Sequence, residues 1–283
     1  MKRREFLKTL AFGVIGLGIA PELMAQNNES GSTTAPDQID DHIKDYLHKM
    51  AYFNKPHKDD ILIENITYKT FKSTVKRLRR LQGYVGHGNF QVLSLDEALK
   101  FARNASQVGE FTSEELRFME KIFYEEAQHY GFFGNKPLKQ FTERIQKKEV
   151  YKVPYTGNYL YKGVPLETLE RIKQQVGGQL ILTSGVRGVM KQFLLFLNKA
   201  YKADGNLSLA SRSLAPPGYS FHGIGDFDVG QVGFGAANFT EKFTKTEIYE
   251  RLSDLGYLKL RYHEQNLLGV RFEPWHIKIN ADI

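Results

Sequence analysis

The pattern of apolar residues changes near residue 150, and this change limits the folds that the chain can adopt. Before it, apolar residues recur at helical spacing, most clearly after Thr112 and Glu115, which form a capping box for a helix predicted to run to about Tyr130. After it, short apolar runs alternate with amphipathic segments, without the regular spacing of repeated strand–helix–strand units. We therefore predict an α+β fold, with a small antiparallel sheet and flanking helices preceded by a mostly helical N-terminal region.

The predicted elements of the second half follow from these runs. A buried strand is expected at 180–183 and a helix at 189–203. Thr244 and Glu247 form another capping box, which predicts a helix that ends at Gly256. Further strands are predicted at 207–211, 227–229 and 270–280. We therefore predict that residues 40–283 consist of a helical region at 40–150 and a C-terminal domain at 151–283.

Residues 1–25 have the features of a cleavable export signal. A basic start precedes an apolar run at 11–20, which is too short to span a bilayer, and Ala25 offers a small residue for cleavage. Arg3-Arg4-Glu5-Phe6-Leu7-Lys8 resembles the twin-arginine export motif, which implies the twin-arginine export machinery as a partner and a periplasmic or cell-envelope location. An ordinary secretion signal or a retained anchor is the alternative. Residues 26–39 form a polar linker, and no stable transmembrane segment is expected in the mature form.

The residue composition restricts the chemistry of any site. The sequence contains no cysteine, so a metal site must use His, Asp and Glu, and neither a thiol nucleophile nor a disulfide is available. The formal net charge is +7, and the lysines and arginines are scattered along the chain. Nucleic-acid binding is therefore not predicted, because it requires clustered basic residues, whereas a basic surface suits an anionic polymer of the cell envelope.

Three short segments concentrate the residues that can carry chemistry. They are Ser184-Gly185-Val186-Arg187 with the downstream Gln192, the segment from Ser220 to Asp228, and Glu273-Pro274-Trp275-His276. A catalytic zinc ion takes three protein ligands and keeps one position open for water, whose pKa it lowers to about 7. His222, one of the nearby aspartates and His276 can supply the ligands. Glu273 can act as the general base, and Arg187 as the cation that stabilises charge on the carbonyl oxygen.

The order and spacing of these segments resemble the zinc D-alanyl-D-alanine carboxypeptidases, a family that includes vancomycin-resistance dipeptidases and carboxypeptidases. The family carries S-x-Y-R with a downstream Gln, S-x-H-x-x-G-x-A-x-D, and E-x-W-H. Ser184, Arg187 and Gln192 match the first motif, Ser220, His222 and Gly225 the second, and Glu273, Trp275 and His276 the third.

This resemblance covers about residues 180–283 and implies both a function and a set of roles. The function is hydrolysis of peptidoglycan peptides that end in D-Ala, with Zn²⁺ as the cofactor. The resemblance makes His222 and His276 zinc ligands and Glu273 the general base. Arg187 polarises the scissile carbonyl or holds the substrate. The predicted substrate-binding residues are Ser184, Gln192 and Ser220, together with Arg212.

The chain departs from the family pattern at the third ligand. The family has Asp seven residues after His, where this chain has Val229, whereas Asp226 and Asp228 lie four and six residues after His222. Phe227-Asp228-Val229 repeats the family's hydrophobic-Asp-hydrophobic strand pattern, and the glycines before it allow a tighter turn. We therefore predict Asp228 as the ligand, with Asp226 as the alternative. Val186 also replaces the family's Tyr, at a position that is not a ligand.

Other functions and roles stay open on the sequence alone. One alternative is another zinc peptidoglycan peptidase, such as an endopeptidase, and another is a non-catalytic cell-wall-binding protein. The glycines at 230, 233 and 235 invite a nucleotide-binding interpretation, but their order is not G-x-G-x-x-G. Arg212 is predicted to bind a peptide carboxylate through its two-pronged guanidinium, with a surface arginine as its alternative, and Arg187 has a structural ion pair as its alternative.

Overall fold

The computed structural model describes residues 41–279, and the side chains from residue 44 onward. The predicted export signal and the predicted linker lie outside these residues. The described residues form one compact unit. Within the described residues, no helix combines the length and the apolar character needed to cross a membrane.

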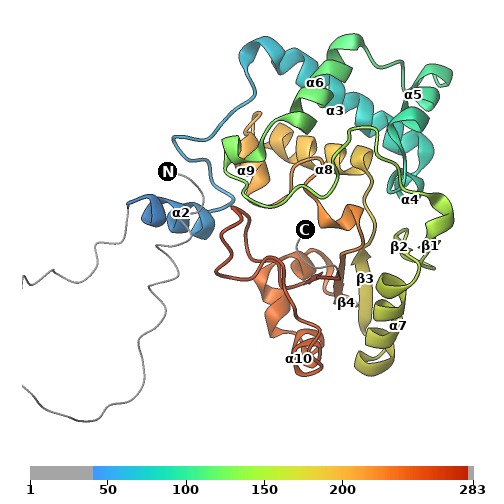
Figure 1. Cartoon of the computed structure of the whole chain (residues 1–283), viewed down its shortest axis with the longest axis vertical. Helices are drawn as coiled ribbons and strands as arrows, with labels where there is room; N and C mark the ends of the chain where they lie inside the picture. Colours follow the sequence, from blue (N-terminus) through green and yellow to red (C-terminus); the bar gives the residue numbers. More distant parts are fainter. Residues whose placement is uncertain (1–40, 280–283) are drawn as a thin grey trace, which may run out of the picture. The chain divides into compact units, whose positions relative to one another are not determined.

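The first part of the described chain is helical. Its helices are α2 (Asp41–Ala51), α3 (Asn65–Val85), α4 (His87–Phe90), α5 (Leu95–Asn104) and α6 (Ser113–Tyr124), followed by the short 3₁₀ helices η1 (Ala127–Tyr130) and η2 (Lys147–Glu149). The capping boxes of α5 and α6 are both formed, with Ser94 and Thr112 as the capping residues. Helix α3 packs against α6 and against α8 (Val189–Lys202) (Figure 1). The first apolar core therefore contains residues from both sides of the predicted boundary at residue 150.

Two small antiparallel sheets follow. β1 (Val150–Lys152) pairs with β2 (Tyr159–Tyr161), and the second sheet has the order β3 (Leu180–Ser184), β4 (Phe227–Gln231) and β5 (His276–Ile277). Helix α7 (Val164–Val176) packs on β3 and against α10 (Glu247–Asp254), and these elements enclose a second apolar core (Figure 1). The remaining elements are α9 (Leu207–Ser211), η3 (Phe221–Gly223), η4 (Gly235–Phe239) and η5 (Glu241–Lys245). The predicted α+β class, with a small antiparallel sheet after a helical region, is confirmed.

Several boundaries differ from the sequence prediction, and each has a local cause. Segment 207–211 is the helix α9 and not a strand, because the side chain of Asn206 accepts a hydrogen bond from Leu209 N and caps a helical turn. Helix α6 ends at Tyr124 because Glu125 adopts an extended backbone. Helix α10 is capped by Thr246, two residues after the predicted Thr244. The last strand covers only His276–Ile277.

Candidate metal centre

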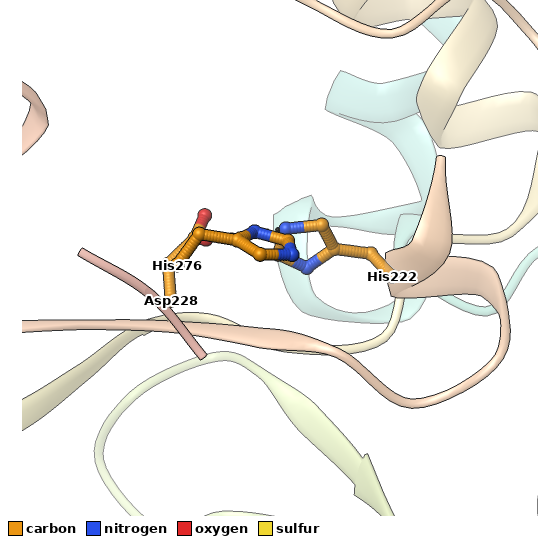
Figure 2. A group of neighbouring side chains, drawn as sticks. All are labelled: His222, Asp228 and His276. Carbon is orange, nitrogen blue, oxygen red and sulfur yellow. Dashed lines mark hydrogen bonds and ion pairs between the residues drawn. The ribbon is translucent and has the colours of Figure 1, made fainter. Parts of the chain in front are cut away.

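Three side chains from the ends of two strands and a turn meet in one cluster. Asp228 lies in β4, directly opposite His276 of β5, and His222 lies in η3, just before β4. One ligand atom from each residue lies within 4.8 Å of the others, and all three residues are buried. Figure 2 shows His222 approaching from the turn, with Asp228 and His276 coming together from the other side. This arrangement can hold a metal ion, and it brings together the three ligands predicted from the sequence.

The orientation of His222 is set by its backbone surroundings. Its Nδ1 lies 2.8 Å from the carbonyl oxygen of Gly185, so Nδ1 carries the proton and donates to that oxygen. Its Nε2, which lies 3.2 Å from Asp228 Oδ1, is thereby left as a lone-pair donor facing the cluster. Residue 185 must be glycine here, because a Cβ at this position would lie 2.0 Å from the carbonyl oxygen of Tyr159.

The two aspartates contact His276 from opposite edges of its ring. Asp228 Oδ1 lies 3.0 Å from Nδ1, on the cluster side, and Asp226 Oδ2 lies 3.0 Å from Nε2, behind the ring. Asp226 is itself held by Arg261 Nε at 2.7 Å and by the backbone N–H of Ile279 at 2.9 Å. A carboxylate on the far nitrogen of a histidine fixes its tautomer and its direction, as in many metal sites. Asp226 therefore stands where it can orient His276.

The electrostatics of the cluster follow from burial and from these contacts. Burial lowers the pKa of His222 and Arg187 lowers it further, which favours the neutral imidazole. Burial also lowers the pKa of His276, but the hydrogen bonds to Asp226 and Asp228 outweigh it and raise that pKa to about 9. Burial raises the pKa values of both aspartates, and their pairing with the histidines and with arginine lowers them well below the ordinary range.

Glu273 has the properties of a proton carrier. It lies three residues before His276 and lines the same pocket as the three ligands. Burial raises the pKa of Glu273 to about 7, although His276 acts in the opposite direction. A carboxyl group with a pKa near 7 can accept a proton and give it back at neutral pH, which is what a general base and acid must do.

Arg187 is the cation that touches the cluster. Its Nη2 donates to Asp228 Oδ2 at 2.8 Å and lies 2.9 Å from His222 Nε2, while its Nε donates to Ser184 Oγ at 3.0 Å. A bulge between Leu182 and Ser184 in β3 places Ser184 opposite Asp228, which brings Arg187 to the cluster. A metal ion bound to His222 Nε2 would require Arg187 to release its contact with that nitrogen, whereas its contact with Asp228 is to Oδ2, the oxygen that does not face the histidines.

The cluster opens into a pocket of about 440 Å³. The three ligands, Glu273, Arg187, Ser184 and Ser220 all line it. Gln192 does not, although its side chain donates to the carbonyl oxygen of Ala215, a residue of the pocket wall. Phe53 and Gln91 line the same pocket from the helical region, and sequence reasoning did not find them.

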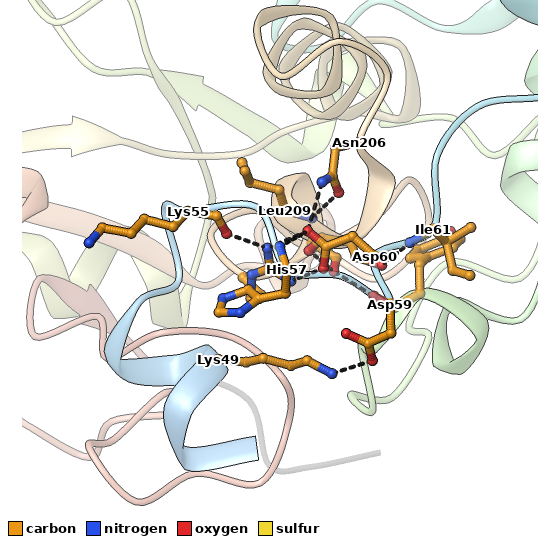
Figure 3. Close-up of polar contacts among 12 residues, drawn as sticks. Lys49, Lys55, His57, Asp59, Asp60, Ile61, Asn206 and Leu209 are labelled. Carbon is orange, nitrogen blue, oxygen red and sulfur yellow. Dashed lines mark hydrogen bonds and ion pairs between the residues drawn. The ribbon is translucent and has the colours of Figure 1, made fainter. Parts of the chain in front are cut away.

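Arg212 is placed elsewhere, where it pairs with Asp60. Figure 3 shows Asp60 among neighbouring polar residues that include His57 and Asn206. The guanidinium of Arg212 forms a two-pronged ion pair with Asp60, at 2.6 and 2.9 Å, and also donates to the carbonyl oxygens of Phe53 and Lys55. Asp60 also accepts from Asn206 and from the backbone N–H of His57. Arg212 is buried and is not among the residues that line the pocket, so the structure does not bring it to the predicted substrate site. The sequence predicted that Arg212 binds the carboxylate of a peptide, whereas in the structure it binds the carboxylate of Asp60 within the same chain.

Two histidines and a carboxylate in a buried cluster, with a second carboxylate of raised pKa in the same pocket, define a metal-dependent hydrolase site. The chain matches a known family over the part that builds this site. Residues 163–281 match the model described as VanY, D-alanyl-D-alanine carboxypeptidase.

Comparison with solved structures finds chains that match part of this one. A vancomycin-resistance D,D-pentapeptidase VanY from a VanB-type cassette, in complex with Zn(II), is 27% identical over 46% of this chain and 78% of its own, with a TM-score of 0.36. VanYB in complex with D-alanine-D-alanine is 26% identical over 47% of this chain and 77% of its own, with a TM-score of 0.37. The LD-carboxypeptidase LdcB is 22% identical over 52% of this chain and 66% of its own, with a TM-score of 0.36. A search of curated proteins gave no match.

Proposed function

We propose that this protein is a zinc-dependent D-alanyl-D-alanine carboxypeptidase that removes the terminal D-Ala from peptidoglycan stem peptides. The observation that carries the proposal is the buried His222, Asp228 and His276 cluster, within the segment that matches the VanY family model. The catalytic roles of individual residues given below are part of the same proposal.

The residues of the cluster fit a zinc ion. His222 Nε2, His276 Nδ1 and a carboxylate oxygen of Asp228 are the donor types that catalytic zinc sites use, and three protein ligands leave a position for water or substrate. The other nitrogen of each histidine is occupied by Gly185 or by Asp226, which directs the free nitrogen inward. When bound, zinc supplies Lewis-acid chemistry, polarising a carbonyl group and making water more acidic.

The chain's own residues complete the reaction. Glu273 takes a proton from the attacking water and returns it to the nitrogen of the leaving D-Ala, which its pKa of about 7 permits in both directions. Arg187, held by Ser184, stabilises the negative charge that develops on the scissile carbonyl oxygen. Ser184 and Ser220 lie at the pocket surface, where their hydroxyl groups can bind the peptide, and Gln192 holds the wall at Ala215.

We further propose that the protein acts in the cell envelope after export. The support is the basic start and apolar run of residues 1–25 and the resemblance of Arg3-Arg4-Glu5-Phe6-Leu7-Lys8 to the twin-arginine motif. Peptidoglycan is an envelope polymer, so the location and the proposed substrate agree.

The experiment that tests the function measures products and metal together. Purified protein should contain about one zinc per chain. It should convert a stem pentapeptide ending in D-Ala-D-Ala to a tetrapeptide plus free D-Ala, as seen by mass spectrometry. Cleavage at an internal bond would favour an endopeptidase, and binding to sacculi without turnover would favour a wall-binding protein. Full activity after zinc removal would rule out the proposed mechanism.

A further inference from the structure

The wall of the pocket that includes one face of α8 carries more positive charge than the proposed reaction uses. Besides Arg187, the pocket is lined by Lys191, Lys199 and Arg271, whereas its only lining carboxylates are Asp228 and Glu273 of the catalytic set. Lys191 and Lys199 are both half-buried in α8. No ion pair is found for either lysine or for Arg271 within the described residues 44–279. Unpaired cations in a half-buried wall favour an anionic ligand.

The two lysines lie on one face of α8. Lys191, Leu195 and Lys199 are spaced four residues apart, so they share the helix face that borders the pocket. Eight residues of helix rise by about 12 Å, which matches three to four residues of an extended peptide. The positive wall is therefore long enough to contact a substrate well beyond the bond that is cut.

The positive charges along this wall have different neighbours. Burial and the nearby Arg187 together lower the pKa of Lys191 to about 8. Burial also lowers the pKa of Lys199, and there the positive neighbours are Arg271 and Lys202. Arg271 itself has Glu273, Glu241 and Asp228 as acidic neighbours. Lys199 and Arg271 thus form a second positive centre, beside that of Lys191 and Arg187.

Arg271 is held in a fixed orientation at this second centre. Its guanidinium carbon lies 4.7 Å from the ring centre of Trp275 and 5.0 Å from that of Phe53, so the side chain is placed between two aromatic residues. Its buried Nε has no hydrogen-bond partner among the described residues. A planar cation that is already immobilised loses little entropy when it binds a carboxylate.

We propose that Lys199 and Arg271 form an anion subsite that selects peptides carrying a free carboxylate on the N-terminal side of the scissile bond. This inference rests on the proposed carboxypeptidase function and deepens it by naming the substrate class. The carboxylate at the end of the peptide lies only one residue beyond the scissile bond. Lys199 lies eight residues along α8 from Lys191, so the Lys199–Arg271 centre is suited to an acidic group further along the peptide.

The test compares two peptides that differ by one carboxylate. Both end in D-Ala-D-Ala, and the residue before this pair is either lysine or diaminopimelate, which is lysine with one additional carboxylate. We expect kcat/KM to be about tenfold higher for the diaminopimelyl peptide, mainly through KM, because one charge-assisted contact has about this value. The preference should shrink as ionic strength rises.

The key variant is Lys199→Gln, with Lys202→Gln as the matched control. Both remove one charge from α8, but Lys202 is exposed and does not line the pocket. Lys199→Gln should reduce the preference to about twofold, and Lys202→Gln should retain it. Arg271→Gln should act like Lys199→Gln, but it also disturbs the stacking with Phe53 and Trp275, so Lys199→Gln decides the matter.

The outcomes separate this inference from the proposed function. Equal cleavage of both peptides by the wild type, or a preference that survives in Lys199→Gln, overturns the anion subsite while leaving the carboxypeptidase in place. The effect of Lys199→Gln on kcat/KM could also disappear when the C-terminus of the peptide is amidated, and persist when diaminopimelate is replaced by lysine. Lys199 would then bind the terminal carboxylate of the peptide, and this result also overturns the proposed subsite. If neither peptide is cleaved, the function fails, and calorimetric binding of the two peptides to the zinc-loaded protein still tests the subsite.

Discussion

Replacing each of the two neighbouring aspartates by asparagine tests directly which of them is the metal ligand. Asp228→Asn removes a carboxylate that contacts both histidines of the cluster, whereas Asp226→Asn changes a group that contacts only the far nitrogen of His276. Both substitutions keep the size of the side chain and remove one negative charge. They remove a carboxylate from opposite sides of His276, so each serves as a control for the other.

The structure gives an expected magnitude for each variant. Loss of one of three ligands should abolish stoichiometric zinc in Asp228→Asn. Loss of the carboxylate behind a ligating histidine typically lowers metal affinity about 10- to 100-fold, so Asp226→Asn should still hold zinc at micromolar metal. Asp226 also pairs with the buried Arg261, and breaking such a pair lowers the free energy of unfolding by about 3–5 kcal/mol. The Asp226 variant should therefore be less stable than the wild type and better loaded with metal than the Asp228 variant.

The assay is zinc content after gel filtration, followed by competition with a chromogenic chelator and by urea unfolding of the metal-free proteins. Urea unfolding separates the effect on the fold from the effect on the metal. Zinc lost only in the Asp226 variant would refute the assignment and would make Asp226 the ligand.

Four further predictions concern catalysis, proton release on zinc binding, stability and export. Glu273→Ala should keep its zinc, while kcat falls about 10²- to 10⁴-fold in a D-Ala release assay. Zinc binding near pH 7 should release about one proton, because His276 of the metal-free protein has a pKa of about 9 and must lose its proton to coordinate; calorimetry in buffers of different ionisation enthalpy measures this, and zinc affinity should fall as the pH is lowered. Asp60→Ala leaves a buried arginine without its carboxylate and should lower the free energy of unfolding by about 3–5 kcal/mol in urea, with zinc content unchanged. Replacing Arg3 and Arg4 by lysine should stop export, measured by fractionation, if the twin-arginine route is used.

The sequence was sufficient for the features that depend on short-range chemistry. The two histidines and Glu273 could be found because metal sites need few residue types and the chain has no cysteine. The hydrophobic-Asp-hydrophobic pattern of the strand favoured Asp228, and the register of β4 against β5 does place Asp228 opposite His276. The strand at 180–183 and the helix at 189–203 were found for the same reason, because their apolar patterns are local.

The sequence was insufficient wherever the partner lies far away in the chain. Arg212 reads as a carboxylate binder, but its partner is Asp60, more than a hundred residues earlier, so no local pattern shows the pair. The segment 207–211 alternates like a strand, yet all five residues are buried, and the Asn206 cap decides for a helix. The spacing of Lys191 and Lys199 was visible, but not which face of the helix borders the pocket.

The helical region has a part in the proposed site through the contacts around Asp60. Asp60 forms an ion pair with Arg212, and Arg212 donates to the carbonyl oxygen of Phe53, so these contacts connect the segment that carries Phe53 to the end of α9. The ring of Phe53 stacks on Arg271, and the residues directly after Arg212, beginning with Ser213, form part of the pocket wall. Arg212 thus holds the segments of Phe53 and Ser213, which both line the pocket, although Arg212 itself does not line it. The metal cluster comes from the C-terminal segment alone, whereas the shape and charge of the pocket depend on both parts of the chain, so differences in substrate choice among such enzymes can arise far from the metal ligands.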